Sequence, residues 1–132
     1  MKKVLTVGVF DLLHIGHVNL FKNAKGCGDY LIVAVQKEES ISRFKEVSNV
    51  AYSTSERVFM VESIRYVDEV IVYDSVDDLL GKVDFDVFAK GPDQCHVGFQ
   101  NFVSWCEKNQ KEVIIIPRTE GISSTLLRNN KA

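Results

Sequence analysis

The sequence predicts a single α/β domain built on a parallel β-sheet of five strands. Short, nearly continuous apolar runs rich in β-branched residues alternate along the chain with stretches whose apolar residues recur at helical spacing. Repeated units of strand, helix and strand connect through right-handed crossovers and produce a doubly wound parallel sheet. The length of 132 residues suits one such domain, which we expect to span residues 1–132.

The first strand, helix and strand are predicted between residues 3 and 35. Residues 3–9 and 30–35 are apolar runs typical of strands that are buried on both faces. Between them, apolar residues recur at helical spacing, namely Leu20, Phe21 and Ala24. Gly26 and Gly28 then favour the end of this helix before the next strand begins.

The same pattern predicts three further strands, at residues 69–73, 86–90 and 113–116. Ser53 and Glu56 form a capping box that starts a helix before the first of these strands. Another helix precedes the last strand, with apolar residues at positions i, i+3, i+4 and i+7, namely Phe99, Phe102, Val103 and Cys106. Together these elements predict a five-stranded, doubly wound sheet of the Rossmann-like kind.

The composition excludes several classes of function. A formal net charge of -2 argues against a protein that binds nucleic acid or an anionic membrane surface. No apolar run approaches the roughly 20 residues of a membrane span, so we expect no membrane insertion. Cys27, Cys95 and Cys106 cannot all pair within one chain and lack the spacing of a zinc site. We therefore expect a cytoplasmic protein with no metal bound by its side chains alone.

The loop after the first strand is the clearest candidate site, because ligands of such sheets bind beyond the carboxyl ends of the strands. It reads Gly8-Val9-Phe10-Asp11-Leu12-Leu13-His14-Ile15-Gly16-His17. His14 and His17 can share one face of the first helical turn, where unpaired N–H groups and the helix dipole favour an anion. Gly16 allows a ligand to approach the backbone closely. The pattern favours a phosphate-binding pocket; the alternative is that both histidines only cap the helix.

A second candidate site follows the last strand, in the segment Arg118-Thr119-Glu120-Gly121-Ile122-Ser123-Ser124-Thr125. A Ser or Thr cap with free backbone N–H groups favours an anion, and Arg118 adds a fork of donors for phosphate oxygens. Two helix N-termini that face one crevice can hold a polyphosphate between them. The alternative is an ordinary helix cap beside a surface arginine.

These motifs make the chain resemble the cytidylyltransferases, and most closely the bacterial glycerol-3-phosphate cytidylyltransferases. Three segments carry the resemblance: Gly8-Val9-Phe10-Asp11 with His14-Ile15-Gly16-His17, Arg65-Tyr66-Val67-Asp68-Glu69-Val70, and the segment from Arg118 to Thr125. The His-x-Gly-His signature alone marks the wider nucleotidyltransferase superfamily, which includes adenylyltransferases. The other two segments are more specific to the cytidylyltransferases.

The resemblance implies a nucleotidyltransferase that moves CMP from CTP to a small phosphorylated alcohol and releases pyrophosphate. Glycerol 3-phosphate is the first choice of acceptor, which gives CDP-glycerol for cell-surface polymer biosynthesis. The family reaction is direct in-line attack on the α-phosphorus, normally with Mg²⁺ accompanying the nucleotide. The resemblance also implies a homodimer formed around the first helix and residues 65–70.

The resemblance assigns roles position by position. It makes His14 and His17 the groups that contact the triphosphate and stabilise transition-state charge, with Lys45 and Arg118 as further catalytic contacts. The expected nucleotide-binding residues are Gly8, Val9, Phe10, Asp11, His14, Gly16, His17, Asp93, Arg118, Thr119, Glu120, Gly121, Ile122, Ser123, Ser124 and Thr125. The expected acceptor-binding residues are Arg43, Lys45, Arg65 and Asp68. For Arg65 and Asp68 the alternative is a salt bridge at a helix end.

The sequence departs from the glycerol-3-phosphate enzymes at two places. Lys90-Gly91-Pro92-Asp93 replaces their Gly-Asp-Asp and is similar to the Lys-Gly-x-Asp of heptose-phosphate adenylyltransferases. Ser75-Val76-Asp77 stands where the family tends to carry a tryptophan. An adenylyltransferase acting on a sugar phosphate or flavin phosphate is therefore the alternative enzyme, and a non-catalytic nucleotide-binding sensor module is the alternative from another class.

Overall fold

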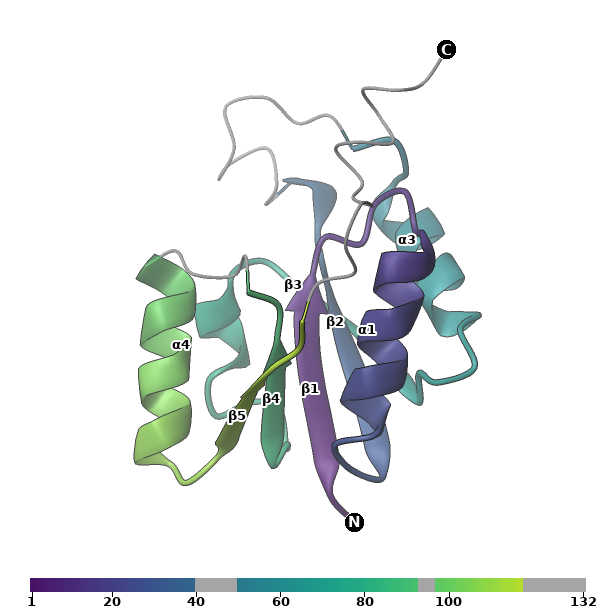
Figure 1. Cartoon of the computed structure of the whole chain (residues 1–132). Coiled ribbons are helices and arrows are strands. Elements are labelled where there is room, and N and C mark those ends of the chain that lie inside the picture. Colours follow the sequence, from purple (N-terminus) through teal and green to yellow (C-terminus); the bar gives the residue numbers. More distant parts are fainter. Residues whose placement is uncertain (40–49, 93–96, 118–132) are drawn as a thin grey trace.

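The computed structural model describes residues 1–39, 50–92 and 97–117. These residues form one five-stranded sheet whose strand pairs are all parallel, in the order β3-β2-β1-β4-β5 (Figure 1). The strands are β1 (Lys3–Gly8), β2 (Tyr30–Gln36), β3 (Glu69–Tyr73), β4 (Val87–Lys90) and β5 (Glu112–Ile115). The predicted fold class, a doubly wound α/β domain with a five-stranded parallel sheet, is confirmed.

Helices cover both faces of this sheet. The helices are α1 (Ile15–Lys25), α3 (Thr54–Glu62) and α4 (Val97–Lys108), with the 3-10 helix η1 (Val76–Leu79). The helices α1 and α3 pack on one face, and α4 and η1 pack on the other (Figure 1). The residue pattern predicts no element between β3 and β4. The structure has η1 there, which buries two apolar side chains, Val76 and Leu79, on the sheet.

The apolar runs of the sequence become the two central strands because both of their faces are covered. The four inner residues of β1 and the five inner residues of β2 are all buried. Side chains alternate between the faces, so the core has two halves. The half under α1 and α3 includes Val4, Phe21, Leu31, Val33, Val61 and Val87. The half under α4 and η1 includes Leu5, Val7, Phe85, Phe88, Phe102 and Cys106.

The strand order places a ligand edge at the carboxyl ends of β1 and β4. The chain passes from β1 through α1 to β2 on one side, whereas β4 pairs with β1 on the other side. The connections therefore diverge between β1 and β4, which is the switch point at which such sheets bind ligands. This edge is the upper edge of the sheet in Figure 1, where α1 begins.

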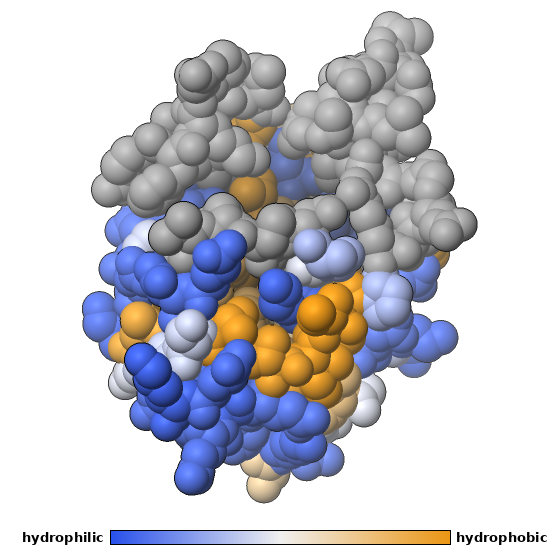
Figure 2. Space-filling view, turned by 60° about the vertical axis from the view of Figure 1, so that its left-hand side comes forward, coloured by the Kyte–Doolittle hydropathy of each residue, from blue (hydrophilic) through white to orange (hydrophobic). Residues whose placement is uncertain are grey.

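Two surface properties of the described part of the chain follow from its sequence. None of its helices has the length and apolar character needed to cross a membrane. The edge strand β5 exposes Ile115, and apolar side chains gather among hydrophilic ones on the side of the molecule that carries α4 and β5 (Figure 2).

Candidate active site

Two histidines form the cap of α1 at the carboxyl end of β1. The backbone N–H of Gly16 donates a hydrogen bond to Nδ1 of His14, at 3.0 Å. The backbone N–H of His14 in turn donates to Nδ1 of His17, at 3.3 Å. This is a capping box in which imidazoles take the positions that Ser or Thr and Glu usually occupy. The capping role that the sequence analysis kept as an alternative is therefore present.

The same hydrogen bonds leave both rings able to bind an anion. Because each Nδ1 accepts a hydrogen bond, the hydrogen of each neutral imidazole lies on Nε2. The rings stack with their centroids 4.0 Å apart and their planes 28° apart, so the two donors belong to one pair. The capping role thus does not consume the Nε2–H groups that would bind phosphate oxygens.

His17 is held in its neutral form. Burial, and secondarily the nearby His14, lower the pKa of His17 to about 4, although Asp11 acts in the opposite direction. A proton on Nδ1 would also remove the hydrogen bond that His17 accepts from the His14 backbone. At neutral pH His17 is therefore an uncharged hydrogen-bond donor.

The loop between β1 and α1 folds tightly around Phe10. Phe10 and Leu12 both have positive φ, 54° and 50°, a region that residues other than glycine rarely adopt. The Phe10 ring packs edge-on against His17, with centroids 5.7 Å apart, and against Phe21, with centroids 5.1 Å apart. A Cβ atom at Gly8 would lie 2.8 Å from Phe10 Cζ, so only glycine leaves room for this ring. Gly8 thereby helps to position His17.

Asp11 ties this loop to the segment that leads into α3. Its side chain is almost fully buried. Oδ2 accepts a hydrogen bond from the backbone N–H of Ala51 at 2.7 Å, and Oδ1 accepts one from Tyr52 at 3.1 Å. Within the described residues, Asp11 therefore orders the loop between β1 and α1 through these backbone hydrogen bonds.

Arg57 is a buried residue of the site region that the sequence analysis missed. Its Nη1 donates to the carbonyl of Val9 at 2.8 Å and to that of Gln36 at 2.7 Å. Its Nε and Nη2 reach the Tyr52 carbonyl at 3.2 Å and the Thr54 hydroxyl at 3.3 Å. Burial lowers the pKa of Arg57, and the nearby Asp11 carboxylate opposes that effect. The guanidinium stays charged, because arginine is the strongest base among the side chains. Arg57 joins the carboxyl ends of β1 and β2 to α3.

One sequence signal points to Arg57. It lies four residues before Val61 and so shares the buried face of α3. A charged residue on the apolar stripe of an amphipathic helix requires buried acceptors. The spacing alone does not identify those acceptors, which come from three separate segments.

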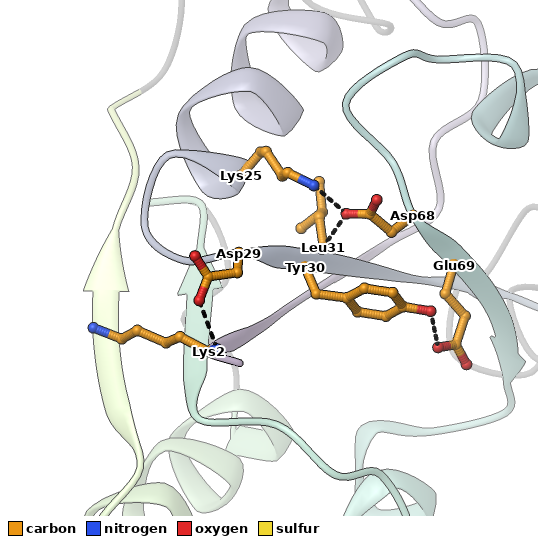
Figure 3. Close-up of polar contacts among 7 residues, drawn as sticks. All are labelled: Lys2, Lys25, Asp29, Tyr30, Leu31, Asp68 and Glu69. Atoms are coloured by element: carbon orange, nitrogen blue, oxygen red, sulfur yellow. Dashed lines mark hydrogen bonds and ion pairs between the residues drawn. The ribbon is translucent and has the colours of Figure 1, made fainter.

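The structure places Asp68 away from the histidines. Asp68 precedes β3 at the amino edge of the sheet, the edge opposite α1's first turn. Its carboxylate accepts a hydrogen bond from the Leu31 backbone at 2.8 Å and pairs with the Lys25 ammonium (Figure 3). Burial by itself raises the pKa of Asp68. The hydrogen bonds from Lys25 and Leu31 outweigh that effect and lower the pKa below its ordinary value. Within one chain, Asp68 therefore stabilises the amino edge of the sheet and does not meet the histidines.

Other polar contacts at the amino edge surround Asp68, and they concern structure. The Tyr30 hydroxyl donates to Glu69 at 2.9 Å, and the Lys2 backbone N–H donates to Asp29 at 2.9 Å (Figure 3). The salt bridge that the sequence analysis considered between Arg65 and Asp68 is not the one formed, because Lys25 is the partner of Asp68. Arg65 is exposed just after α3.

Several expected site residues cannot be placed against this geometry. Arg43, Lys45, Asp93 and the segment from Arg118 to Thr125 lie outside the described residues. Within the described ranges, no three His, Cys, Asp or Glu side chains gather as a set of metal ligands. The described part of the site therefore consists of two imidazole donors at a helix N-terminus, with Phe10, Asp11 and Arg57 holding the loop that presents them. Such an arrangement can bind phosphate oxygens.

Comparison with known proteins gives consistent results. A family model described as cytidylyltransferase-like matches residues 5–130. The glycerol-3-phosphate cytidylyltransferase of Bacillus subtilis (strain 168) is 40% identical, over 100% of this chain and 98% of its own length. The FAD synthase of Thermococcus kodakarensis is 37% identical over 96% of this chain and 78% of its own length. A solved structure described as the lipopolysaccharide core biosynthesis protein from Thermoplasma volcanium GSS1 superposes with a TM-score of 0.73 at 26% identity, covering 90% of this chain and 97% of that one.

Proposed function

The chain belongs to the cytidylyltransferase-like family, and on that premise we propose that it transfers CMP from CTP to a small phosphorylated alcohol. Glycerol 3-phosphate is the preferred acceptor, which makes CDP-glycerol the product and pyrophosphate the by-product. The observation that carries the proposal is the stacked pair His14 and His17 at the N-terminus of α1, in which each Nδ1 accepts a backbone hydrogen bond so that the ring hydrogen lies on Nε2. The full-length similarity to a glycerol-3-phosphate cytidylyltransferase supports the choice of nucleotide and acceptor.

The reaction is one direct displacement. An oxygen of the acceptor phosphate forms a bond to the α-phosphorus of CTP, and the bond from that phosphorus to the β-phosphate oxygen breaks. The electron pair leaves with pyrophosphate, and no proton has to move because the attacking oxygen is anionic. Catalysis then consists of positioning the two phosphates and stabilising the charge that shifts between them.

His14 and His17 act as hydrogen-bond donors to the triphosphate. As the bond to the β-phosphate breaks, negative charge grows on the leaving oxygens, and donors already held in place stabilise it without reorganisation. A neutral His17 suits this role, because its low pKa keeps the ring in one protonation state in the free protein at neutral pH. The dipole of α1, whose positive end lies at this first turn, adds to the same field.

Mg²⁺ is proposed as the cofactor that accompanies the triphosphate. The described residues supply no ligand set of their own, and both carboxylate oxygens of Asp11 accept backbone hydrogen bonds. The phosphate oxygens of the nucleotide are the hard ligands that this ion prefers. When bound, the ion supplies charge neutralisation of the triphosphate, while the chain supplies orientation.

The remaining expected contacts are part of the same proposal. Arg118 to Thr125 and Asp93 bind the nucleotide, and Arg43 and Lys45 bind the acceptor. Arg65 lies in the connection from α3 to β3, at the edge of the sheet opposite the histidines, so within its own chain it is not retained as an acceptor contact. Asp68 is not retained as an acceptor contact within its own chain, because its carboxylate serves Lys25 and Leu31 at the opposite edge of the sheet. A homodimer around α1 and residues 65–70 is proposed on the family resemblance. The exposed Ile15 and Phe59 on α1 and α3 are apolar surface that such a dimer could cover.

A cytoplasmic location and a role in cell-surface polymer biosynthesis complete the proposal. Cys27 and Cys106 are free thiols in the structure, as expected of a protein in a reducing compartment. The location can be checked by fractionating cells that express the tagged chain, and recovery with the membrane or outside the cell would contradict it.

The second candidate is an adenylyltransferase acting on a sugar phosphate or flavin phosphate. Two observations favour it: the similarity to an FAD synthase over nearly the whole chain, and the segment Lys90-Gly91-Pro92-Asp93 in place of Gly-Asp-Asp. The histidine pair would act in the same way, because both reactions displace pyrophosphate from an α-phosphorus.

The test is pyrophosphate release in the presence of Mg²⁺, with CTP or ATP and a panel of acceptors. The panel contains glycerol 3-phosphate, ribitol 5-phosphate, phosphocholine, heptose 1-phosphate and flavin mononucleotide. Release with CTP and glycerol 3-phosphate supports the first candidate, and release with ATP and a sugar phosphate or flavin mononucleotide supports the second. No release with any pair would contradict both and favour a non-catalytic nucleotide-binding module.

A further inference from the structure

Lys90 occupies the ligand edge on the second side of the switch point. It is the last residue of β4, which pairs directly with β1. Its backbone carbonyl accepts a hydrogen bond from Ile116 at 2.8 Å, so the position of its backbone is held by the chain that leaves β5. Lys90 therefore stands beside the carboxyl end of β1, across from the start of α1.

The side chain of Lys90 leaves the sheet on the face opposite the histidines. Successive side chains of a strand point to opposite faces. In β4, Val87 and Ala89 belong to the core under α1 and α3, whereas Phe88 belongs to the core under α4 and η1. Lys90 follows Phe88 by two residues and so shares its face. The histidines lie on the other face, where Phe10 packs against both His17 and Phe21.

Lys90 is also a partly buried cation that the described residues leave without an ion pair. Other lysines at the strand ends are paired: Lys3 with Asp84 at 3.6 Å and Lys37 with Asp74 at 3.7 Å. A cation that has no counter-charge attracts anions, and the attraction is stronger where part of its surface is shielded from water. The surroundings of Lys90 thus favour binding of an anion from outside the described part of the chain.

The geometry of the displacement indicates which anion this is. In phosphoryl and nucleotidyl transfer, the attacking and leaving oxygens lie roughly in line on opposite sides of the phosphorus. If the histidines hold the leaving pyrophosphate on the α1 side, the acceptor phosphate must approach from the α4 side, where Lys90 lies. We propose that Lys90 binds the phosphate of the acceptor and aligns it for attack. This proposal rests on the proposed transfer of a nucleotide to a phosphorylated acceptor.

The test compares the Lys90→Met and Lys90→Arg variants with the wild type and with Lys108→Met as a matched control. Lys108 is an exposed lysine in the last turn of α4, so its replacement removes the same charge far from the site. Losing a charge-assisted hydrogen bond to phosphate should raise the KM for glycerol 3-phosphate at least about tenfold in Lys90→Met. The KM for CTP should stay unchanged, and Lys90→Arg should recover part of the loss.

Direct binding separates this proposal from the proposed function. Calorimetric titration of glycerol 3-phosphate should show weaker binding to Lys90→Met than to wild type and Lys108→Met, whether or not turnover is observed. Equal titrations of all three proteins, including no binding by any, would overturn the role of Lys90. A rise in the KM for CTP that matches the rise for the acceptor would also overturn it. If the wild type releases no pyrophosphate, that result contradicts the proposed function. The titration still tests whether Lys90 binds the acceptor phosphate.

Discussion

Replacing Arg57 tests the claim that a buried cation holds the histidine loop in place. Arg57→Met keeps an unbranched side chain about as far as the position of Nε but removes every donor. Three backbone carbonyls, those of Val9, Gln36 and Tyr52, then lose the hydrogen bonds that Arg57 donates to them. Residue 57 has no exposed surface, so water does not replace those bonds. The Val9 carbonyl matters most for the site because the loop to the histidines begins there.

The magnitude follows from the two short bonds of Nη1, at 2.7 and 2.8 Å. Each hydrogen bond from a charged donor contributes about 1.5–3 kcal/mol. We therefore expect the free energy of unfolding to fall by about 3–6 kcal/mol, which corresponds to a Tm lower by about 10–25 °C in a domain of this size. Turnover at a temperature well below that Tm should fall at least about tenfold, because a displaced histidine loop misaligns the triphosphate.

The assay is urea unfolding followed by circular dichroism, together with turnover at 15 °C. Arg65→Met is the stability control, because it makes the same replacement at an exposed position just after α3. This control should change the free energy of unfolding by less than about 0.5 kcal/mol. Arg57→Lys, which keeps the charge with a single nitrogen, should lie between wild type and Arg57→Met. An Arg57→Met protein within about 1 kcal/mol of wild type and with normal turnover would refute the reasoning.

Three further predictions concern the histidines and the amino edge of the sheet. His14→Ala and His17→Ala should each lower kcat by about 10²–10³-fold while circular dichroism shows an intact fold, since each removes a donor to developing charge; near-normal kcat in either would exclude that histidine from the mechanism. Because the pKa of His17 is lowered from 6.5 to about 4, the unfolded chain binds more protons between these values. The stability of the wild type should therefore fall as the pH drops through that window, and His17→Gln should lose this part of the pH dependence in urea titrations; an identical pH profile in both proteins would contradict a neutral, buried His17. Asp68→Asn should lower the free energy of unfolding by about 1 kcal/mol through its contacts with Lys25 and Leu31, and should leave the KM of both substrates within about twofold; a large KM increase with normal stability would return Asp68 to the active site.

The parts of the site that were predicted from sequence are those formed by residues close together in the chain. The apolar run of β1, Gly8 and the spacing of His14 and His17 place both imidazoles at a helix start by local geometry alone. The capping box extends this result, because the same local spacing brings each Nδ1 to a backbone N–H. The three inner strands β1, β2 and β4 were predictable for a similar reason, since buried strands read as continuous apolar runs. The edge strands β3 and β5 were predictable from their β-branched residues.

The parts that sequence reasoning missed depend on distant segments. Arg57 finds its acceptors at Val9 and Gln36, which are 48 and 21 residues away in the chain. Asp68 pairs with Lys25, at a separation of 43 residues, although Arg65 lies much nearer in sequence. Sequence spacing favours the local partner, whereas the parallel sheet brings the end of α1 beside the start of β3. Contacts of this kind follow from topology, which the pattern of residues specifies only indirectly.

The central claim is that the histidine pair holds the triphosphate of CTP for direct attack by a phosphate monoester. The most direct test measures pyrophosphate release from CTP and glycerol 3-phosphate with Mg²⁺, by the wild type and by His17→Ala side by side. The account predicts release by the wild type that requires both substrates, and a rate about 100-fold or more lower in the folded variant. Equal rates in the two proteins, or release by the wild type from ATP but not from CTP, would contradict it.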